Sequence, residues 1–115
     1  MKLAQWEDIM KILEKIDAAA LENQLDKGLY ILFFTADWCP DCRFIKPAMP
    51  QIEEKYKDYT FIQVDRDENI DLCQELGIMG IPSFVVYRDG KEIARFVNKD
   101  RKTKAEVEHF LDQIA

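Results

Sequence analysis

A run of six apolar residues followed closely by a cysteine pair is the feature that most constrains how this chain folds. The run is Leu29–Phe34, and the pair is Cys39 and Cys42. Because the run is continuous rather than alternating, it is typical of a strand buried on both faces, as in the centre of a parallel sheet. Apolar residues at helical spacing then extend from Cys42 to about Tyr56. The sequence therefore predicts a buried strand, a cysteine pair at its end and a helix that begins near the pair.

Helices and strands alternate along the rest of the chain. Asp89-Gly90 favours a tight hairpin turn, and Thr103 with Glu106 forms a capping box at the start of a helix. The remaining predicted elements are strands at 59–64, 83–87 and 92–97 and helices at 70–76 and 103–114. This order predicts a fold of the α/β class, with a mixed central sheet of about four strands and helices on both faces.

Two helix-forming stretches precede the buried strand. Apolar residues recur at helical spacing from Trp6 to Ile16, which predicts an amphipathic helix over roughly residues 5–16. Residues 17–26 also favour a helix, which Gly28 ends. The pattern leaves open whether these stretches form one bent helix or two. We expect residues 1–28 to be an N-terminal helical segment of a single domain that spans residues 1–115.

Two prolines interrupt the helical pattern after the cysteine pair. Pro47 and Pro50 both lie inside it. Because an interior proline removes a hydrogen bond and kinks a helix, we expect a bend there. Two short helices are the alternative.

Size and charge exclude several classes of protein. The chain has 115 residues, which is enough for one domain. Its net charge is −6, so its surface repels phosphate backbones, and this argues against nucleic acid or an anionic membrane as the main partner. No apolar run approaches the ~18 residues of a membrane helix. The first residues lack the pattern of a secretory signal, and we therefore expect a cytoplasmic protein.

The position of the cysteine pair indicates redox chemistry. Cys39 follows the strand directly, and a helix N-terminus offers unpaired N–H groups that stabilise a thiolate. Cys42 lies within one helical turn, so it can attack a mixed disulfide formed at Cys39. Pro40 fits the first turn, where its missing N–H is no loss. Sulfur carries the electrons in such a reaction, so no bound cofactor is expected.

Two other interpretations of the pair remain open. A zinc site needs four ligands, and Cys73 and His109 are the only further candidates. The pair can also be two structural cysteines in the core. Cys73 itself is expected to be a buried, inert thiol, with a regulatory or dimer-forming thiol as the alternative.

Several motifs together resemble those of the thioredoxin family. They are Phe33 to Cys42 with its Trp38-Cys39-Pro40-Asp41-Cys42 box, Pro47, Gly80-Ile81-Pro82-Ser83 and Asp89-Gly90-Lys91. The resemblance covers roughly residues 29–114 and implies a thioredoxin fold. The box is similar to that of a subgroup of thioredoxin-related proteins in which WCPDC replaces WCGPC.

The resemblance also implies a role for individual residues. Cys39 is expected to be the attacking thiol and Cys42 the resolving thiol. Trp38 and Ile81 are expected to line the substrate groove. Pro82 is expected to be a cis proline beside the sulfurs, and an ordinary trans proline at the start of a strand is the alternative.

Some positions depart from the family pattern. Phe33 stands where thioredoxins usually have a buried aspartate, and Gln63 where they often have a lysine, so the charged pair that the family commonly places behind the resolving thiol is missing. Asp41 is then the nearest candidate base. As a negative charge beside a developing thiolate, Asp41 also raises the pKa of a thiol. The alternative is that Asp41 is only a residue at the start of a helix, with no effect on the sulfurs. Asn98 replaces a glycine of the substrate surface, so we expect it to narrow the groove.

These observations predict a thiol–disulfide oxidoreductase that reduces disulfides of proteins or small molecules. The resemblance implies that the electron donor is a thioredoxin reductase, a flavoprotein that uses NADPH. Two alternatives remain open. One is a glutaredoxin-like reductase coupled to glutathione, against which Trp38 argues. The other is a thioredoxin-fold binding module with weak turnover, which Phe33 and Gln63 favour.

Overall fold

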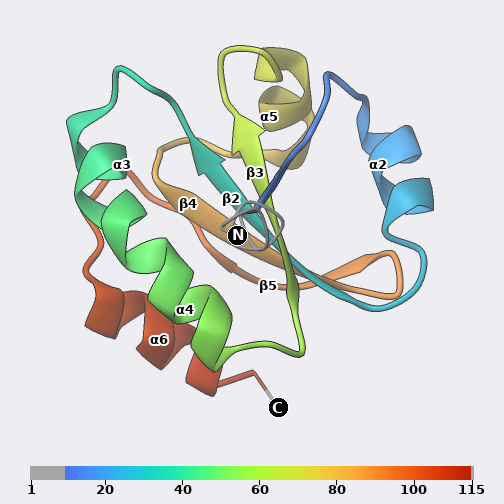
Figure 1. Ribbon diagram of the computed structural model, residues 1–115. Coiled ribbons are helices and arrows are strands. Elements are labelled where there is room, and N and C mark those ends of the chain that lie inside the picture. Colours follow the sequence, from blue (N-terminus) through green and yellow to red (C-terminus); the bar gives the residue numbers. More distant parts are fainter. Residues whose placement is uncertain (1–9, 115) are drawn as a thin grey trace, which may run out of the picture.

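A five-stranded mixed sheet forms the centre of the computed structural model, which describes residues 10–114 (Figure 1). The strand order is β1-β3-β2-β4-β5, and β1, β3 and β2 run parallel to one another. β4 is antiparallel to β2, and β5 is antiparallel to β4. The strands are β1 (Lys11–Ile12), β2 (Leu29–Thr35), β3 (Thr60–Asp65), β4 (Ser83–Arg88) and β5 (Lys91–Phe96). The predicted α/β class and mixed sheet are confirmed, with one strand more than expected.

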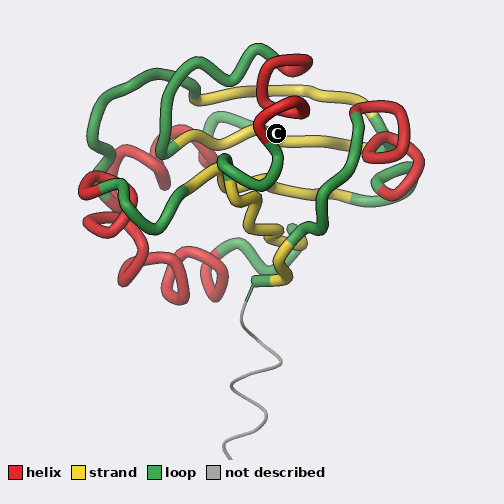
Figure 2. The backbone as a smooth tube through the Cα atoms, turned by 90° about the horizontal axis from the view of Figure 1, so that it is seen from above, coloured by secondary structure: helices red, strands yellow, loops and turns green. Residues whose placement is uncertain are grey.

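Helices cover both faces of the sheet. They are α2 (Ala18–Gln24), α3 (Pro40–Ile45), α4 (Met49–Lys55), α5 (Ile70–Leu76) and α6 (Lys104–Asp112). Buried residues of α3, α4 and α6 share one core with the sheet, and those of α2 and α5 share the other. Figure 2 accordingly shows the strands between the two groups of helices.

The alternation of side chains along β2 explains its uninterrupted apolar sequence. Ile31 and Phe33 lie in the core shared with α3, α4 and α6, whereas Leu32 and Phe34 lie in the core shared with α2 and α5. All four are completely buried. Because successive residues of a strand point to opposite faces, a strand between two helix layers needs apolar residues at every position.

The segment before α2 is a strand rather than the predicted helix. Lys11 and Ile12 pair with β3, and the Leu13 N–H donates to the Gln63 carbonyl at 2.8 Å. Met10 is buried in one core and Leu13 in the other. Residues three positions apart face opposite sides of a strand but the same side of a helix. Two apolar residues at this separation are therefore compatible with a strand between two cores and with a helix on one core. The helix expected over 5–16 is therefore wrong from residue 10 onward, and residues 1–9 lie outside the described part.

The prolines after the cysteine pair divide the helical stretch as expected. A 3-10 turn, Lys46–Ala48, joins α3 to α4. Pro47 lies in the first turn of this 3-10 segment and Pro50 in the first turn of α4, where a proline needs no N–H partner. The structure thus contains the two short helices of the alternative, with the 3-10 turn between them.

Two local signals are confirmed. Asp89 and Gly90 adopt φ values of 51° and 84°, as the hairpin turn between β4 and β5 requires. The Thr103 hydroxyl accepts from the Glu106 N–H, and the Glu106 carboxylate accepts from the Thr103 N–H, which completes the capping box of α6.

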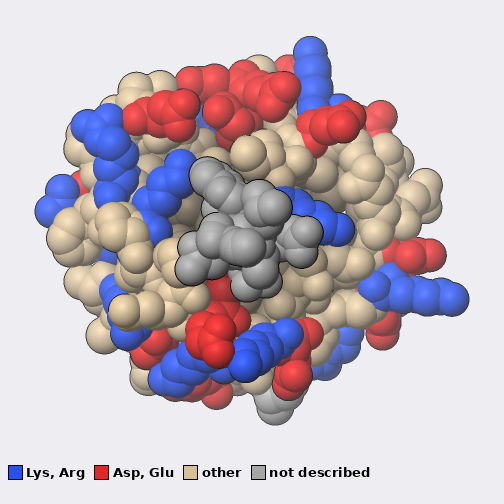
Figure 3. Space-filling view, in the orientation of Figure 1, with Lys and Arg blue, Asp and Glu red and all other residues tan. Residues whose placement is uncertain are grey.

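The surface carries charges of both signs. Lys and Arg side chains are interspersed with Asp and Glu over the face in Figure 3. Among residues 10–114, no helix is long and apolar enough to cross a membrane.

Candidate active site

The two cysteines of the pair lie at the turn between β2 and α3. Cys39 is the N-cap of α3, and its N–H donates to the Ala36 carbonyl at 3.2 Å. The Cys39 sulfur accepts a hydrogen bond from the Cys42 N–H at 3.2 Å. This N–H is one of those that a helix N-terminus leaves without a partner inside the helix. The fold therefore directs a backbone donor at the first sulfur and holds the second sulfur within the same turn.

Burial distinguishes the two thiols. Both are free, and Cys39 keeps 5% of its surface exposed whereas Cys42 keeps 1%. Cys39 is thus largely enclosed, and it is the more accessible of the two. The surface of the turn therefore presents more of Cys39 than of Cys42.

Cys42 is held in its protonated form. Burial, together with its hydrogen bond to Cys39, raises the Cys42 pKa to about 11. Hydrogen bonds from the Thr35 side chain and the Ala36 backbone act in the opposite direction but are weaker. Since only a thiolate is a nucleophile, Cys42 must lose its proton when it attacks.

The segment before β4 completes the environment of the pair. The Ile81–Pro82 peptide bond is cis, as the resemblance implied. The Cys39 sulfur lies 4.0 Å from the Ile81 carbonyl oxygen, and Ile81 packs against the small cluster that Ala36 forms with the two cysteines. Ile81 and Pro82 thus lie beside Cys39, which is the position that a residue lining the substrate groove must occupy.

Trp38 directly precedes Cys39 and contacts the loop after β3. The residue is 56% exposed, and its Nε1 donates to the Asp67 carboxylate at 2.7 Å. The Arg66 guanidinium lies 5.9 Å from the ring centroid. Sequence reasoning missed Asp67 and Arg66, because nothing in a polar loop after a strand signals that it folds over a distant tryptophan.

Asp41 is paired with a residue from the far end of the chain. Its carboxylate accepts from the Arg101 Nε at 2.9 Å, and the Arg101 guanidinium lies 4.4 Å from the Phe44 ring centroid. This cation offsets part of the charge that Asp41 presents to the thiols. The role of Asp41 as a base stays a prediction, and Arg101 is a second residue that sequence reasoning missed.

An aromatic side chain fills the position at which the thioredoxin family usually has a buried aspartate. Phe33 is completely buried and stacks on Phe84, with ring centroids 5.1 Å apart and an interplanar angle of 17°. Gln63 is the direct neighbour of Phe33 across the β2–β3 pairing. The core therefore offers Cys42 no carboxylate at this position.

Asn98 directs its side-chain oxygen to its own loop. The Asn98 Oδ1 accepts from the Lys102 ammonium at 2.8 Å and from the Asp100 N–H at 2.9 Å. The Asn98 carbonyl group lies so close to Gly80 that a side chain on Gly80 would collide with it. Narrowing of the groove by Asn98 stays a prediction.

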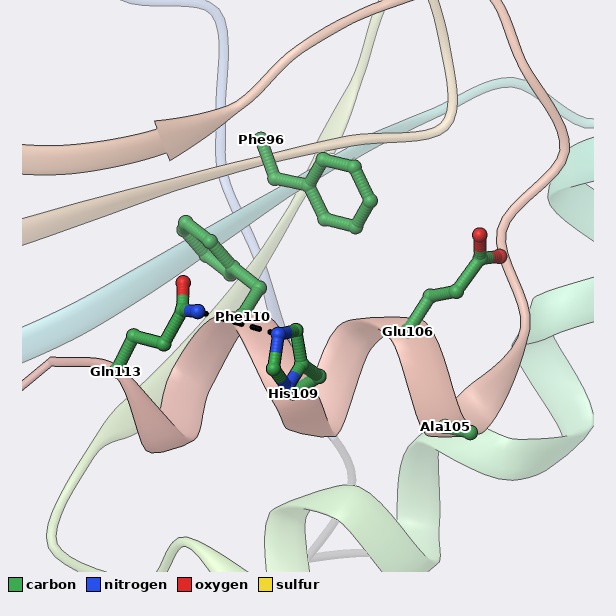
Figure 4. Close-up of a pocket in the computed structure, with 6 residues that line it drawn as sticks. All are labelled: Phe96, Ala105, Glu106, His109, Phe110 and Gln113. Atoms are coloured by element: carbon green, nitrogen blue, oxygen red, sulfur yellow. Dashed lines mark hydrogen bonds between the residues drawn. The ribbon is translucent and has the colours of Figure 1, made fainter.

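Cys73 and His109 lie away from the pair and from each other. Cys73 is 3% exposed in the core shared by α2 and α5, and burial raises its pKa. His109 lies on α6, where its ring bonds to Gln113 at 3.1 Å (Figure 4). The hollow drawn there is lined by residues of β5 and α6 and by Gln113, which follows α6, and it contains no residue of the predicted site. Residues 10–114 place no three potential metal ligands together, which argues against the zinc alternative.

Comparisons with known sequences agree with this geometry. The family model described as Thioredoxin matches residues 12–113. Thioredoxin X, chloroplastic, of Arabidopsis thaliana is 35% identical over 82 residues, which cover 70% of this chain and 45% of that protein. The TPR repeat-containing thioredoxin TDX of Oryza sativa subsp. japonica is 40% identical over 73 residues, which cover 64% of this chain and 23% of that protein. The matched part is therefore less than half the length of these two relatives.

Solved structures show the same architecture. The X-ray structure of Fasciola hepatica thioredoxin superposes with a TM-score of 0.75 at 28% identity, over 92% of this chain and 100% of that one. The crystal structure of thioredoxin from Trypanosoma brucei brucei gives a TM-score of 0.79 over 93% of this chain and 91% of that one. Its 21% identity makes it evidence for the fold alone.

The region that matches the family model contains nearly the whole sheet, both thiols of the pair and the cis proline beside them. Fold and site thus lead to the same conclusion, and this chain belongs to the thioredoxin family.

Proposed function

We propose that this chain is a thiol–disulfide oxidoreductase that reduces disulfides of proteins or small molecules. The Cys39 thiolate attacks one sulfur of the substrate disulfide, which forms a mixed disulfide and releases the first substrate thiol. Cys42 then loses its proton and attacks the Cys39 sulfur. The second substrate thiolate leaves and takes up a proton, and the Cys39–Cys42 disulfide holds the two oxidised sulfurs.

The observation that carries this proposal is the arrangement of the two thiols at the start of α3. The Cys42 N–H donates to the Cys39 sulfur at 3.2 Å, so both groups occupy one turn. An N–H aimed at a sulfur stabilises negative charge on it, whether Cys39 is the attacking thiolate or the leaving group of a later reduction. A pair of purely structural cysteines has no need of this contact.

Turnover of two disulfides tests the proposal. The reduced chain is expected to reduce both insulin and a small disulfide, with dithiothreitol as the electron source, and Cys39→Ser is expected to abolish both activities. Cys73→Ser is the matched control, since it removes a buried thiol outside the pair. Equal activity of the wild type and Cys39→Ser would refute the proposal.

We further propose that the chain acts in the cytoplasm and receives electrons from a thioredoxin reductase that uses NADPH. Three free cysteines suit a reducing compartment, and a dithiol that turns over needs a donor. Oxidation of NADPH by a purified thioredoxin reductase in the presence of the oxidised chain tests the donor. Fractionation of source cells tests the compartment. Glutathione with glutathione reductase is the control for a glutaredoxin-like enzyme.

A binding module with weak turnover is the second candidate, and one observation favours it. Cys42 is buried with a raised pKa, and Phe33 replaces the carboxylate that would take its proton. If release of the substrate from the mixed disulfide is slow, covalent adducts at Cys39 accumulate in the wild type as they do in Cys42→Ser. Mass spectrometry of both proteins after reaction with a small disulfide distinguishes a module from an enzyme.

A further inference from the structure

A guanidinium group is held against the helix turn that contains the cysteine pair. The Arg101 Nε donates to the Asp41 carboxylate at 2.9 Å, and the same guanidinium lies 4.4 Å from the Phe44 ring centroid. Asp41 and Phe44 both belong to α3, and Asp41 lies between the two cysteines in the sequence. The Arg101 side chain nevertheless keeps 51% of its surface exposed. Two contacts therefore fix a cation that a substrate can still reach.

The loop of residues 98–102, which carries Arg101, is braced from inside by a buried lysine. Lys102 keeps only 1% of its surface exposed. Its ammonium group donates to the Asn98 Oδ1 and the Asp100 carbonyl at 2.8 Å each and to the Asn98 carbonyl at 3.4 Å. These acceptors match the three N–H donors of an ammonium group. The backbone that presents Arg101 is therefore held in place.

The loop also contacts both segments that lie against the Cys39 sulfur. One is the first turn of α3, where the Cys42 N–H donates to that sulfur at 3.2 Å and to which Arg101 attaches the loop. The other is the segment before β4, where the Ile81 carbonyl oxygen lies 4.0 Å from the sulfur. A Cβ on the preceding Gly80 would lie 2.4 Å from a carbonyl oxygen of the loop. Contacts on two sides thus place the loop beside the cysteine pair, and it runs beside α3 in Figure 1.

Most of the hydrogen-bonding capacity of Arg101 is unused. A guanidinium group has five N–H donors in a planar fork. Within residues 10–114, only its Nε has a hydrogen-bond partner, so both Nη groups remain available. An exposed ion pair adds little to stability, so the stability of the fold does not account for the way the side chain is held. The Nη groups are suited to donate to the oxygens of a carboxylate.

The surface around Arg101 is positive although the chain is negative. Residues 37–46 and 98–102 carry five Lys and Arg against three Asp, a net charge of +2, whereas the whole chain has a net charge of −6. Four of these five cations are exposed. Figure 3 accordingly shows Lys and Arg side chains over α3. An anion that comes close to Arg101 therefore meets a locally favourable charge, even though the field of the whole chain repels it at long range.

We propose that Arg101 is a specificity-determining residue that binds a substrate carboxylate beside the disulfide sulfur that Cys39 attacks. This inference rests on the proposed function and names its substrate class, which is disulfides that carry a carboxylate close to the sulfur. Such a carboxylate belongs either to a small thiol compound or to an acidic peptide segment. Arg101 changes no bond: its Nη groups donate to the carboxylate while Cys39 attacks, which favours the reaction of these substrates over that of uncharged ones.

Two disulfides that differ only in this group test the inference. They are N,N′-diacetylcystine, which carries two carboxylates, and its diamide. We measure the rate at which each oxidises the reduced chain, by acid quench and mass spectrometry, at about 0.15 M salt, where charges more than about 8 Å apart are largely screened. The ratio of the carboxylate rate to the amide rate reports the contact, because a general change in thiol reactivity affects both rates alike.

Asp41→Asn is the reference background, because it removes the carboxylate that Arg101→Met would leave unpaired to repel an anionic substrate. In this background Arg101→Met is expected to lower the ratio about three- to tenfold, through loss of charge-assisted hydrogen bonds at a half-exposed position. Lys99→Met in the same background is the matched control. It removes the same charge from an exposed position of the same loop, and it is expected to change the ratio less than about twofold.

A second pair of substrates distinguishes the two sources of the carboxylate. It consists of the disulfides of acetyl-Glu-Cys-amide and acetyl-Gln-Cys-amide. A fall of the ratio with this pair as well assigns acidic peptide segments, and a fall confined to the first pair assigns small carboxylate compounds. A ratio that Arg101→Met leaves unchanged for both pairs, or that Lys99→Met lowers equally, overturns the inference. If none of these disulfides oxidises the reduced wild type, the proposed function itself fails first.

Discussion

Burial controls the chemistry of individual residues at this site. Cys42 and Lys102 each keep 1% of their surface exposed, and the proposed reaction requires Cys42 to become an anion in these surroundings. A charge in a medium of low dielectric costs much less when an opposite charge lies near it. Burial therefore holds Cys42 in its neutral form, in agreement with its raised pKa, whereas the Lys102 ammonium group relies on hydrogen bonds to its own loop.

The raised pKa of Cys42 predicts how stability changes with pH. The thiol pKa rises from 9.0 to about 11 in the folded protein, so the folded state binds the proton more tightly than the unfolded chain. The resulting stabilisation is complete below about pH 9 and is lost as the pH rises through about 11. Its size is about 3 kcal/mol. Cys42→Ser is expected to lack this part of the alkaline fall.

Urea unfolding of the reduced wild type and of Cys42→Ser across this pH range measures the difference. Tyr56, Tyr87 and Cys73 also have raised pKa values and contribute to the fall in both proteins. Only the difference between the two curves belongs to Cys42. Parallel curves would show that Cys42 titrates alike in the folded and unfolded states.

The Asp41–Arg101 pair predicts a change in thiol reactivity. Arg101→Met leaves the Asp41 carboxylate without the cation that binds it at 2.9 Å, and an unpaired negative charge opposes formation of a nearby thiolate. We expect alkylation of Cys39 by iodoacetamide at neutral pH to be a few times slower, with the free energy of unfolding reduced by less than about 1 kcal/mol. Asp41→Asn in the same chain is expected to restore the rate. Equal rates in all variants would mean that this pair does not act on the thiols.

At the scale of elements, sequence patterns were reliable where one local interaction decides the structure. The turn at Asp89-Gly90 and the capping box of Thr103 and Glu106 depend on residues within a few positions of each other, and both formed as predicted. The segment at Lys11–Ile12 became a strand because β3 offered it a free edge. No property of residues 10–16 alone reveals that edge, so the pattern indicated a helix.

The contact between Gly80 and Asn98 predicts that a single methyl group disturbs the site. A Cβ on Gly80 would collide with the backbone of Asn98 and Lys99, neither of which can move aside as the end of a flexible side chain can. Gly80→Ala is expected to lower the free energy of unfolding by about 1–3 kcal/mol and to slow turnover of a small disulfide. Gly77→Asn is the comparison, because Asn tolerates the left-handed conformation at that helix end. Wild-type stability and turnover in Gly80→Ala would show that the two loops separate freely.

Across the whole molecule, the site is assembled from segments that are remote in sequence. The cysteine pair, the Ile81–Pro82 bond and Trp38 were predictable, because a motif and a family resemblance identified them. Asp67, Arg101 and Lys102 were not, because each becomes important only through a contact 29 or more positions away or through burial by other elements. A lysine in a polar loop ordinarily indicates a solvated surface. Only the folded chain shows that Lys102 is enclosed.

The charge of the whole chain leads to a prediction about substrates. A net charge of −6 gives a field that attracts cations and repels anions before any specific contact forms. We expect the reduced chain to react several times faster with cystamine, a cationic disulfide, than with the anionic 3,3′-dithiodipropionate at low ionic strength. Added salt screens such interactions beyond about 10 Å at 0.1 M, so the ratio of the two rates is expected to fall as salt is added. Stopped-flow rates over a range of sodium chloride concentrations measure it. A ratio that does not change with salt would assign the preference to contacts within the groove, where Trp38 and Ile81 lie, rather than to the charge of the chain.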